Sequence, residues 1–338
     1  DCGVCDGGNA DMDDCGVCFG NNEADEGCGC FNGPTSYYWS DYDNDGYQDL
    51  YVTNFGPDKL YKNNGDSTFV DVTVTAGVQD AVVTHRSMGC AWGDYDQDGY
   101  TDFIVVRHLE KWESEWEKKS EFIDAVGSLA LFHNNGQGGF TNVTHLLGDT
   151  SGPNKNKGET VGNLWGAGFQ PVWVDFDNDG DLDLYVVNDF GYQVQPNVLW
   201  RNDGSAADGT WSFVDVSTSS GAGVSMSGMG LAVGDYNLDG SLDFFMTNIG
   251  QNTLLKNNGD GQTFTISTLD SGVGVPKIGR LPRVAWGTVF FDYDNDGDQD
   301  LYWLGSTVAR GEAPGGQTFP SAGRMLRGDG LGSFEDIT

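Results

Sequence analysis

Five short acidic segments contain the residues of this sequence whose types and spacing could do chemistry. Each follows the pattern Asp-x-Asp-x-Asp-Gly-x-x-Asp, with one Asn substitution, and the segments begin at Asp41, Asp94, Asp175, Asp235 and Asp292. Side chains at positions 1, 3, 5 and 9 and the carbonyl at position 7 can surround one hard cation, because the glycine at position 6 lets the backbone turn sharply. Carboxylates this close repel one another by about 1 kcal/mol per pair in water, so each loop favours a bound divalent cation. The pattern predicts calcium sites.

The spacing assigns four side-chain ligands and one carbonyl ligand to each loop. Asn237 replaces a carboxylate, so the fourth loop is predicted to bind calcium most weakly. Mg²⁺ suits the loops less, because it requires a small octahedron and retains its water. We expect about five Ca²⁺ ions, with dissociation constants of roughly 10⁻⁴ to 10⁻³ M, that join the first two strands of each repeat unit. The predicted ligands are Asp41, Asp43, Asp45, Tyr47 and Asp49; Asp94, Asp96, Asp98, Tyr100 and Asp102; Asp175, Asp177, Asp179, Asp181 and Asp183; Asp235, Asn237, Asp239, Ser241 and Asp243; and Asp292, Asp294, Asp296, Asp298 and Asp300, with the carbonyl ligand fourth in each loop.

The first 30 residues form a separate region that contains six of the seven cysteines. No hydrophobic core can form there, so cross-links or metals must hold its shape. Two CxxC pairs nine residues apart are compatible with zinc. The even cysteine count and the surrounding Asp and Asn favour disulfides, with room for further calcium and with open connectivity. We assign residues 1–34 to a Cys- and Asp-rich stalk or linker whose disulfide candidates are Cys2, Cys5, Cys15, Cys18, Cys28 and Cys30.

A repeat organises the remainder, residues 35–338, since the acidic loops recur at steps of 53, 81, 60 and 57 residues. Short apolar runs before and after each loop read as strands, for example Val172–Val174 and Leu184–Asn188. A third strand follows, then an Asn/Asp/Gly hairpin turn and a fourth strand such as Phe140–Thr144. The pattern predicts an all-β fold, a β-propeller of four-stranded antiparallel blades. The units cover about residues 37–75, 88–146, 168–217, 228–267 and 284–338.

One long insertion interrupts the repeat. Between residues 109 and 126, Trp112, Trp116 and Ile123 recur near helical spacing, which predicts one short amphipathic helix packed on the propeller. The polar, glycine-rich stretch from Gly148 to Gly162 is predicted to be a long exposed loop.

The charge of the chain limits its partners. The formal net charge is −34, and the ten positive charges of five Ca²⁺ ions would leave −24. Such a chain repels nucleic acid and anionic membranes. No run approaches the roughly 18 apolar residues of a membrane-spanning helix. A chain that begins at Asp1 without methionine is expected to be a processed product or an excised fragment.

Three sequence features carry a resemblance to known repeats. They are the pattern FxDYDNDGDxDLYxxN, the pattern NxLYxNNGDxxFxDVT, and the small-residue approach Met229-Gly230 or Trp286-Gly287. These features resemble the FG-GAP and VCBS-type repeats of integrin α-subunit propellers and, more closely, the cartilage acidic protein (ASPIC/UnbV) family. The N-terminal region resembles thrombospondin type 3-like Asp/Cys repeats. The resemblance implies a secreted or cell-surface calcium-binding propeller. Members often have seven blades and a C-terminal ASPIC domain, whereas five units are legible here, and we expect five blades.

The expected function is a structural or adhesive interaction module, for instance within a surface or filamentous assembly. Other extracellular proteins, glycans and further copies of the chain are the candidate partners. Catalysis finds little support, because the four histidines lie far apart and no G-x-S-x-G motif occurs. Cys90 is expected to be a buried free thiol. The alternative is a carbohydrate-binding protein or a propeller-type polysaccharide lyase that stacks sugars on Trp112, Trp116, Trp165, Trp200 and Trp211.

Overall fold

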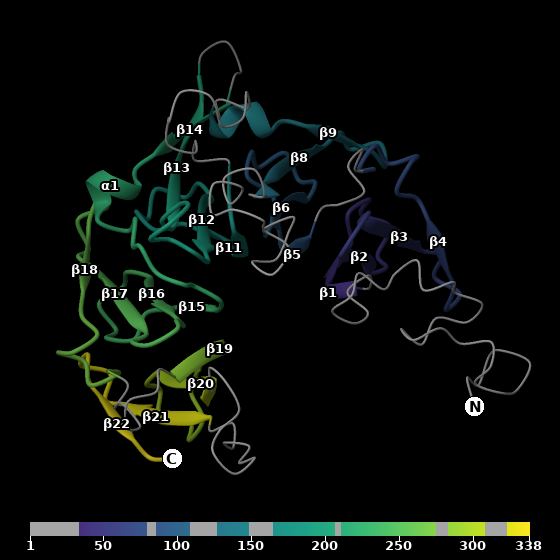
Figure 1. Cartoon of the computed structure of the whole chain (residues 1–338). Helices are drawn as coiled ribbons and strands as arrows, with labels where there is room; N and C mark the ends of the chain where they lie inside the picture. The colour runs from purple at the N-terminus through teal and green to yellow at the C-terminus, as the bar shows by residue number, and fades with distance from the viewer. Residues whose placement is uncertain are drawn as a thin grey trace, which may run out of the picture.

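Five four-stranded antiparallel sheets, the blades of a β-propeller, make up most of the described chain in a computed structural model. The structure describes residues 34–79, 86–108, 127–148, 165–206, 211–274, 283–307 and 323–338. The blades follow an arc, with blade 1 at one end and blade 5 at the other (Figure 1). The predicted all-β class and its five units are confirmed.

Each blade is a meander in which the strand order follows the sequence. Blade 1 consists of β1 (Pro34–Ser40), β2 (Asp49–Asn54), β3 (Lys59–Asn63) and β4 (Phe69–Asp71). Blade 2 consists of β5 (Ser87–Gly93), β6 (Asp102–Arg107), β8 (Ala130–Asn134) and β9 (Phe140–Asn142). Blade 3 consists of β11 (Gly168–Val174), β12 (Asp183–Asn188), β13 (Val198–Ser205) and β14 (Trp211–Asp215). Blade 4 consists of β15 (Leu231–Gly234), β16 (Asp243–Met246), β17 (Thr253–Asn257) and β18 (Phe264–Ile266). Blade 5 consists of β19 (Arg283–Phe291), β20 (Asp300–Thr307), β21 (Arg324–Gly328) and β22 (Phe334–Asp336).

The smaller elements lie beside the blades. Strands β7 (Gly127–Ser128) and β10 (Trp165–Gly166) pair with each other. A 3₁₀ turn, η5 (Thr144–Leu147), follows blade 2, and a single helical turn, α1 (Ser217–Ser220), follows blade 3. Within the described residues, neither helical turn has the length and apolar character that crossing a lipid bilayer requires.

The fourth strand of each blade ends earlier in the sequence than predicted. In blade 2 the predicted run Phe140–Thr144 stops at Asn142. The Thr144 hydroxyl takes the place of a ladder carbonyl, because its oxygen accepts the amide of Leu131 at 3.0 Å. The chain can therefore leave the sheet and enter η5. The other blades use the same hydroxyl acceptor, at Thr73, Ser217, Thr268 and Thr338.

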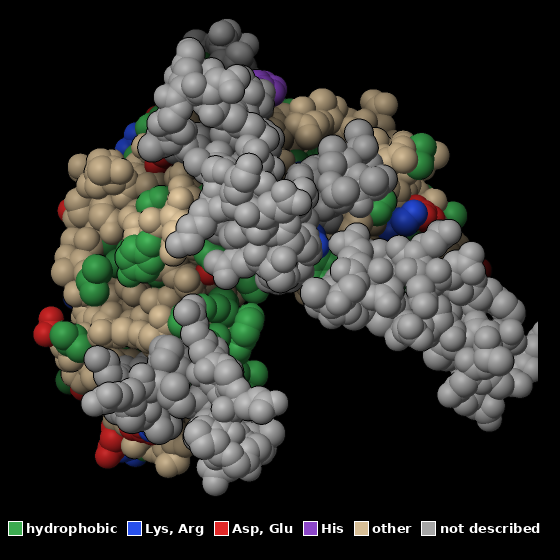
Figure 2. All heavy atoms as spheres, viewed as in Figure 1, with side chains coloured by type: hydrophobic (Ala, Val, Ile, Leu, Met, Phe, Trp, Pro, Cys, Tyr) green, Lys and Arg blue, Asp and Glu red, His purple; other side chains and the backbone are tan. Residues whose placement is uncertain are grey.

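The hydrophobic core is divided into four clusters, each between two adjacent blades. Consecutive residues of a strand point to opposite faces of the sheet. In β6, Phe103 therefore faces blade 1 and packs on Tyr51 with ring centroids 4.8 Å apart, while Ile104 belongs to the cluster shared with blade 3. Hydrophobic side chains also gather along the inner side of the arc over β15 and β19 (Figure 2). The ring centroids of Trp286, in β19, and Phe169 are 6.3 Å apart.

Three expectations fall on residues outside the described part of the chain. They are the disulfides of the first 30 residues, the helix between residues 109 and 126, and residues 149–162 of the glycine-rich loop.

Candidate metal centre

Each acidic loop connects the first and second strands of its blade and turns through two residues with left-handed backbone. At position 4 the five loops have φ between 53° and 60°, and at the position-6 glycine φ lies between 86° and 96°. Glycine adopts this conformation without strain, which confirms the predicted turn. Asn178 at position 4 of the third loop also tolerates it, whereas Leu238 in the fourth loop is an unfavourable residue there.

Hydrogen bonds within each loop fix the carboxylates at positions 1 and 5. In the third loop, Asp175 accepts the amides of Asp179 at 3.1 Å and Gly180 at 3.0 Å. The carboxylate of Asp179 accepts the amide of Asp181 at 2.9 Å. The same three hydrogen bonds recur in the other four loops. The backbone thus holds these side chains in place for a ligand.

The aspartate at position 9 connects the loop to the third strand of its blade. Asp183 is fully buried, and one of its oxygens accepts the amide of Phe176 at 3.0 Å in the loop. Its other oxygen accepts the amide of Asn202 at 2.8 Å in β13. The equivalent residues are also fully buried and make the same two hydrogen bonds; they are Asp49, Asp102, Asp243 and Asp300.

Burial disfavours the charged form of four of the position-9 carboxyl groups. Desolvation raises the pKa of Asp102 and Asp183 to about 8, of Asp243 to about 7 and of Asp49 to about 6. Neighbouring loop carboxylates raise the pKa further, while the backbone hydrogen bonds oppose the shift. A divalent cation beside these groups would favour the ionised form.

The position-3 carboxylates provide the test of whether a cation fits. In three loops one oxygen of this group is buried and has no hydrogen-bond partner among the described residues: Asp43 Oδ1, Asp96 Oδ1 and Asp177 Oδ1. A buried carboxylate oxygen without a donor is costly, and Ca²⁺ accepts oxygen ligands of this kind. The donor set therefore fits calcium.

The predicted ligands converge in four of the five loops. In each of these, three carboxylates bring an oxygen within 4.8 Å of one another; the triads are Asp41, Asp43 and Asp49; Asp94, Asp96 and Asp98; Asp175, Asp177 and Asp183; and Asp292, Asp294 and Asp300. In the fourth loop the amide of Asn237 occupies position 3 and donates to Asp239 at 2.9 Å. That loop therefore has one carboxylate fewer to offer a cation.

A basic side chain of the third strand pairs with loop carboxylates in three blades, and the ligand pattern did not predict it. Lys62 in β3 forms ion pairs with Asp43 and, at 2.8 Å, with Asp45. The equivalent residue of each unit precedes an Asn or Gly of the third strand; these residues are Lys62, His133, Arg201, Lys256 and Arg327. Arg201 and Arg327 pair with Asp203 and Glu335 instead of loop carboxylates. The recurrence of a basic residue at this place was the available sequence signal. The positive charges of Lys62 and Lys256 offset part of the repulsion among the carboxylates of their loops.

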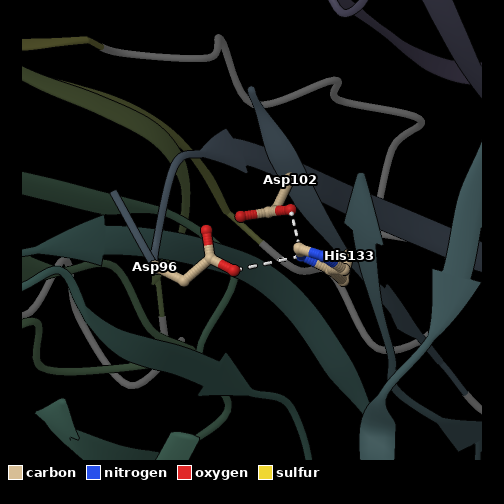
Figure 3. Close-up of side chains that lie close together, drawn as sticks. All are labelled: Asp96, Asp102 and His133. Carbon is tan, nitrogen blue, oxygen red and sulfur yellow. Dashed lines mark ion pairs between the residues drawn. The ribbon is translucent and has the colours of Figure 1, made fainter. Parts of the chain in front are cut away.

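The second loop differs from the others because its basic residue is a histidine. His133 in β8 points toward two loop carboxylates (Figure 3), and its Nδ1 lies 3.2 Å from oxygens of both Asp96 and Asp102. This loop thus combines carboxylates with an imidazole nitrogen, a ligand type that divalent transition metals also accept.

Side chains at position 4 join neighbouring loops. The side-chain amide donates to the carbonyl of the position-6 glycine in the next loop, at 2.9 Å from Asn44, 2.9 Å from Gln97 and 3.4 Å from Asn178. Leu238 holds this position in the fourth loop and has no donor to offer the fifth.

A second side-chain link joins each third strand to the loop of the preceding blade. Asn134 donates to the carbonyl of Tyr42 at 2.7 Å, and Asn202 and Asn257 make the equivalent bonds at 2.9 and 2.7 Å. Blade 5 has Gly328 at this position. The joint between blades 4 and 5 therefore lacks both kinds of side-chain link.

Two other predicted features can be placed. Cys90 is a buried free thiol, as expected. Trp200 is fully buried and donates its indole N–H to the carbonyl of Leu147 at 3.0 Å, so the expectation that it stacks on sugars is wrong. Its ring fills the core between blades 2 and 3 because β13 turns this position inward. Trp211 is half-buried against the same core, while Trp112 and Trp116 lie outside the described residues.

Comparisons with known proteins extend these findings. A family model described as FG-GAP-like repeat matches residues 41–105, 175–246 and 235–303, together more than half of the chain. Human cartilage acidic protein 1 is 30% identical over 142 residues, which cover 40% of this chain and 20% of that protein. The alignment therefore spans about a fifth of that relative.

Two solved structures are similar over most of the chain. A lectin of Agrocybe aegerita that recognises non-reducing terminal N-acetylglucosamine aligns with a TM-score of 0.34 and 16% identity, over 93% of this chain and 83% of the lectin. The Malassezia sympodialis allergen Mala s 1 aligns with a TM-score of 0.42 and 14% identity, over 90% of this chain and 77% of the allergen.

Proposed function

Because the chain belongs to the FG-GAP-like repeat family, we propose that it is an extracellular β-propeller stabilised by calcium and that it acts as a structural or adhesive interaction module. The observation that carries the proposal is the acidic loop, repeated five times at the same place in a blade. In three copies one oxygen of the position-3 carboxylate is buried and has no donor among the residues that the structure describes. The proposed ligands are those assigned from the loop spacing.

Calcium, when bound, supplies the positive charge that the clustered carboxylates lack. The chain's own residues then determine what this charge stabilises. Asp183 and its equivalents join the loop to the third strand, so a cation beside them holds three strands of one blade together. The calcium role is therefore to maintain the scaffold, and we assign no catalytic residue.

The proposed extracellular setting and partners are supported by a sequence similarity and by the net charge of the chain. The similarity to human cartilage acidic protein 1 favours an extracellular assembly. A formal net charge of −34 disfavours nucleic acid as a partner. We propose that the partners are extracellular proteins or glycans, including other copies of this chain.

Thermal unfolding with and without calcium tests the proposal. The melting temperature should be at least several degrees higher in millimolar CaCl₂ than in EGTA, because an ion that binds only the folded state stabilises it. MgCl₂ at equal ionic strength controls for screening. A variant with Asp43→Asn and Asp177→Asn should lose part of the calcium effect. Equal melting temperatures in CaCl₂ and EGTA would contradict the calcium role.

A further inference from the structure

The four joints between neighbouring blades are built on one plan. An aromatic residue at position 2 of each acidic loop packs on the phenylalanine that begins or lies within the fourth strand of the next blade. The ring centroids are 5.5 to 5.7 Å apart in all four pairs, which are Tyr42–Phe140, Tyr95–Phe213, Phe176–Phe264 and Tyr236–Phe334. Every member is buried: the loop aromatics are 2% exposed and the phenylalanines 7% to 9%. A buried aromatic pair of this kind therefore marks each interface between two packed blades.

Both halves of a fifth joint are present at the two ends of the arc. Tyr293 holds position 2 in the loop of blade 5, and Phe69 begins the fourth strand of blade 1. In contrast to their four equivalents, Tyr293 is 40% exposed and Phe69 is 43% exposed. Each end of the molecule thus shows one half of an aromatic pair whose other half is at the opposite end.

The rest of each end face fits the same plan. On blade 5, Leu304 is 50% exposed, while the residues at its strand position in the other blades, Thr53, Val106, Val187 and Thr247, are at most 1% exposed. Val289 and Phe291 are exposed on the same blade. On blade 1, the exposed aromatics Tyr37 and Trp39 lie in β1, and the Trp39 ring contacts Phe69 at a centroid distance of 6.1 Å. Both faces therefore present exposed apolar side chains at positions that are buried between the inner blades.

The polar links of the internal joints also have counterparts at the ends. Asn63 in blade 1 holds the position from which Asn134, Asn202 and Asn257 reach the preceding loop. Asn295 in blade 5 holds the loop position from which Asn44 reaches the next loop. An incoming blade of the same kind would find these donors already placed.

We propose that copies of this chain associate head to tail, with the outer face of blade 5 in one copy packed on the outer face of blade 1 in the next. The contact repeats the joint that already connects the blades within the chain, with Tyr293 of one copy against Phe69 of the other. A second copy is the natural occupant, because the two complementary faces lie at opposite ends of one arc (Figure 1). Such a contact is heterologous, so it builds rings or filaments rather than an isolated two-fold dimer.

This inference deepens the proposed interaction module by naming its partner, and it rests on that function in one respect. Calcium in loops 1 and 5 would reduce the repulsion between two acidic copies beside the contact. Association should therefore be stronger in CaCl₂ than in EGTA.

Sedimentation velocity of the full chain in millimolar CaCl₂, over a hundredfold range of concentration, tests the proposal. The wild-type protein should form species larger than a monomer, and their fraction should rise with concentration. Phe69→Asp and Tyr293→Asp should each weaken association at least tenfold. An equimolar mixture of the two variants should give a 1:1 dimer and nothing larger, because each variant retains one intact face. Tyr192→Asp, which changes an exposed aromatic in blade 3 by the same charge, should associate like the wild type.

The thermal unfolding of each variant shows whether it is folded, and Trp39→Asp with Leu304→Asp provides a second pair if either aspartate variant unfolds. A wild-type protein that remains a monomer at every concentration would overturn the inference, as would variants that associate like the wild type. If the monomer still melts higher in CaCl₂ than in EGTA, only the inference fails. If CaCl₂ has no effect on melting, the proposed calcium function fails, whatever the state of association.

Discussion

At the scale of single residues, the position-9 aspartate is both a proposed calcium ligand and a structural residue. Asp183 holds the amides of the loop and of the third strand, and both bonds form within the protein itself. The position-3 group is different, since Asp177 has a buried oxygen without a donor among the described residues. Position 3 is therefore where a change of residue should alter calcium affinity with little change in the loop itself.

Replacing Asn237 with aspartate should tighten calcium binding by the fourth loop. We expect a gain on the order of tenfold, because the number of charged ligands tunes the affinity of such sites. Isothermal titration of the wild type and the variant measures the change. Gln251→Glu, which adds the same charge at an exposed position outside the loop, is the control. A wild-type fourth loop that is the tightest of the five would contradict the ranking.

Asp58 offers a test of buried charge away from the acidic loops. Its carboxylate accepts hydrogen bonds from Tyr51 at 3.0 Å and Ser87 at 2.7 Å, and burial raises the pKa of Asp58. In blades 3 and 4, Asn197 and Asn252 hold the corresponding position, and the side-chain oxygen of each accepts a backbone amide.

Because the folded state binds the Asp58 proton more tightly than the unfolded state, this group costs stability as the pH rises above the ordinary carboxyl range, about 4. Asp58→Asn removes that cost. The free energy of unfolding of the variant, relative to the wild type, should therefore increase between pH 4 and pH 7, as urea denaturation at several pH values would measure. A difference that is independent of pH, or that shrinks over this range, would count against the argument.

The acidic loops and their left-handed glycine turns could be predicted from sequence, because carboxylates at this spacing around a glycine are typical of calcium loops. The surroundings of other side chains could not be predicted, as two examples show. Lys62 reaches the first loop from a strand far along the sequence, so only the sheet register brings them together. Trp200 was expected to be exposed, and only the direction of its side chain in the sheet shows that it is buried.

At the scale of elements, each loop is a tight turn, and each of the first three loops is tied to the next one by a side-chain hydrogen bond. The left-handed residue at position 4 carries the amide that reaches the next loop in the first three blades. In the fourth, Leu238 adopts the same backbone with φ 53°, which is unfavourable for a leucine.

Leu238→Asn should stabilise the protein. Relief of the left-handed leucine is worth about 1–2 kcal/mol, and a new hydrogen bond to the fifth loop about 0.5–1.5 kcal/mol. Chemical denaturation measures the sum. Asn178→Leu, the reverse change in the third loop, should destabilise the protein by a similar amount. A variant no more stable than the wild type would show that the loop geometry does not govern stability here.

The strands were predictable as elements, since apolar runs and hairpin turns recur in the same order five times. The ends of the fourth strands were not. A hydroxyl such as that of Thr144 can stand in for a backbone carbonyl, and the sequence does not reveal that exchange until the partner amide of Leu131 is known.

At the scale of the whole molecule, stability depends on the joints between blades. Repeat proteins of this kind are held by contacts between nearest neighbours. The number of blades could be predicted by counting loops. Their arrangement along an open arc could not, because it depends on the angle at which one sheet packs on the next.

Truncation of equivalent phenylalanines should separate buried joints from end faces. Phe140→Ala should destabilise the chain by about 3–5 kcal/mol, because it leaves a cavity between blades 1 and 2. Phe69→Ala, at the exposed end, should cost less than about 1 kcal/mol in the monomer. Urea denaturation at low protein concentration, where copies are separate, gives both values. Equal losses would mean that Phe69 is already packed in the monomer.

The missing links at Leu238 and Gly328 have a mechanical consequence. The interface between blades 4 and 5 is held by packing, by backbone contacts and by a hydrogen bond from the Thr247 hydroxyl to the carbonyl of Trp286 at 2.5 Å, without the two kinds of side-chain link found at the earlier joints. Blade 5 should therefore be the first blade to separate from its neighbour under heat or tension. Its backbone amides should exchange with deuterium before those of blades 2 and 3. Blade 5, which carries Tyr293 for the proposed contact with another copy, is then also the blade whose orientation can change most easily.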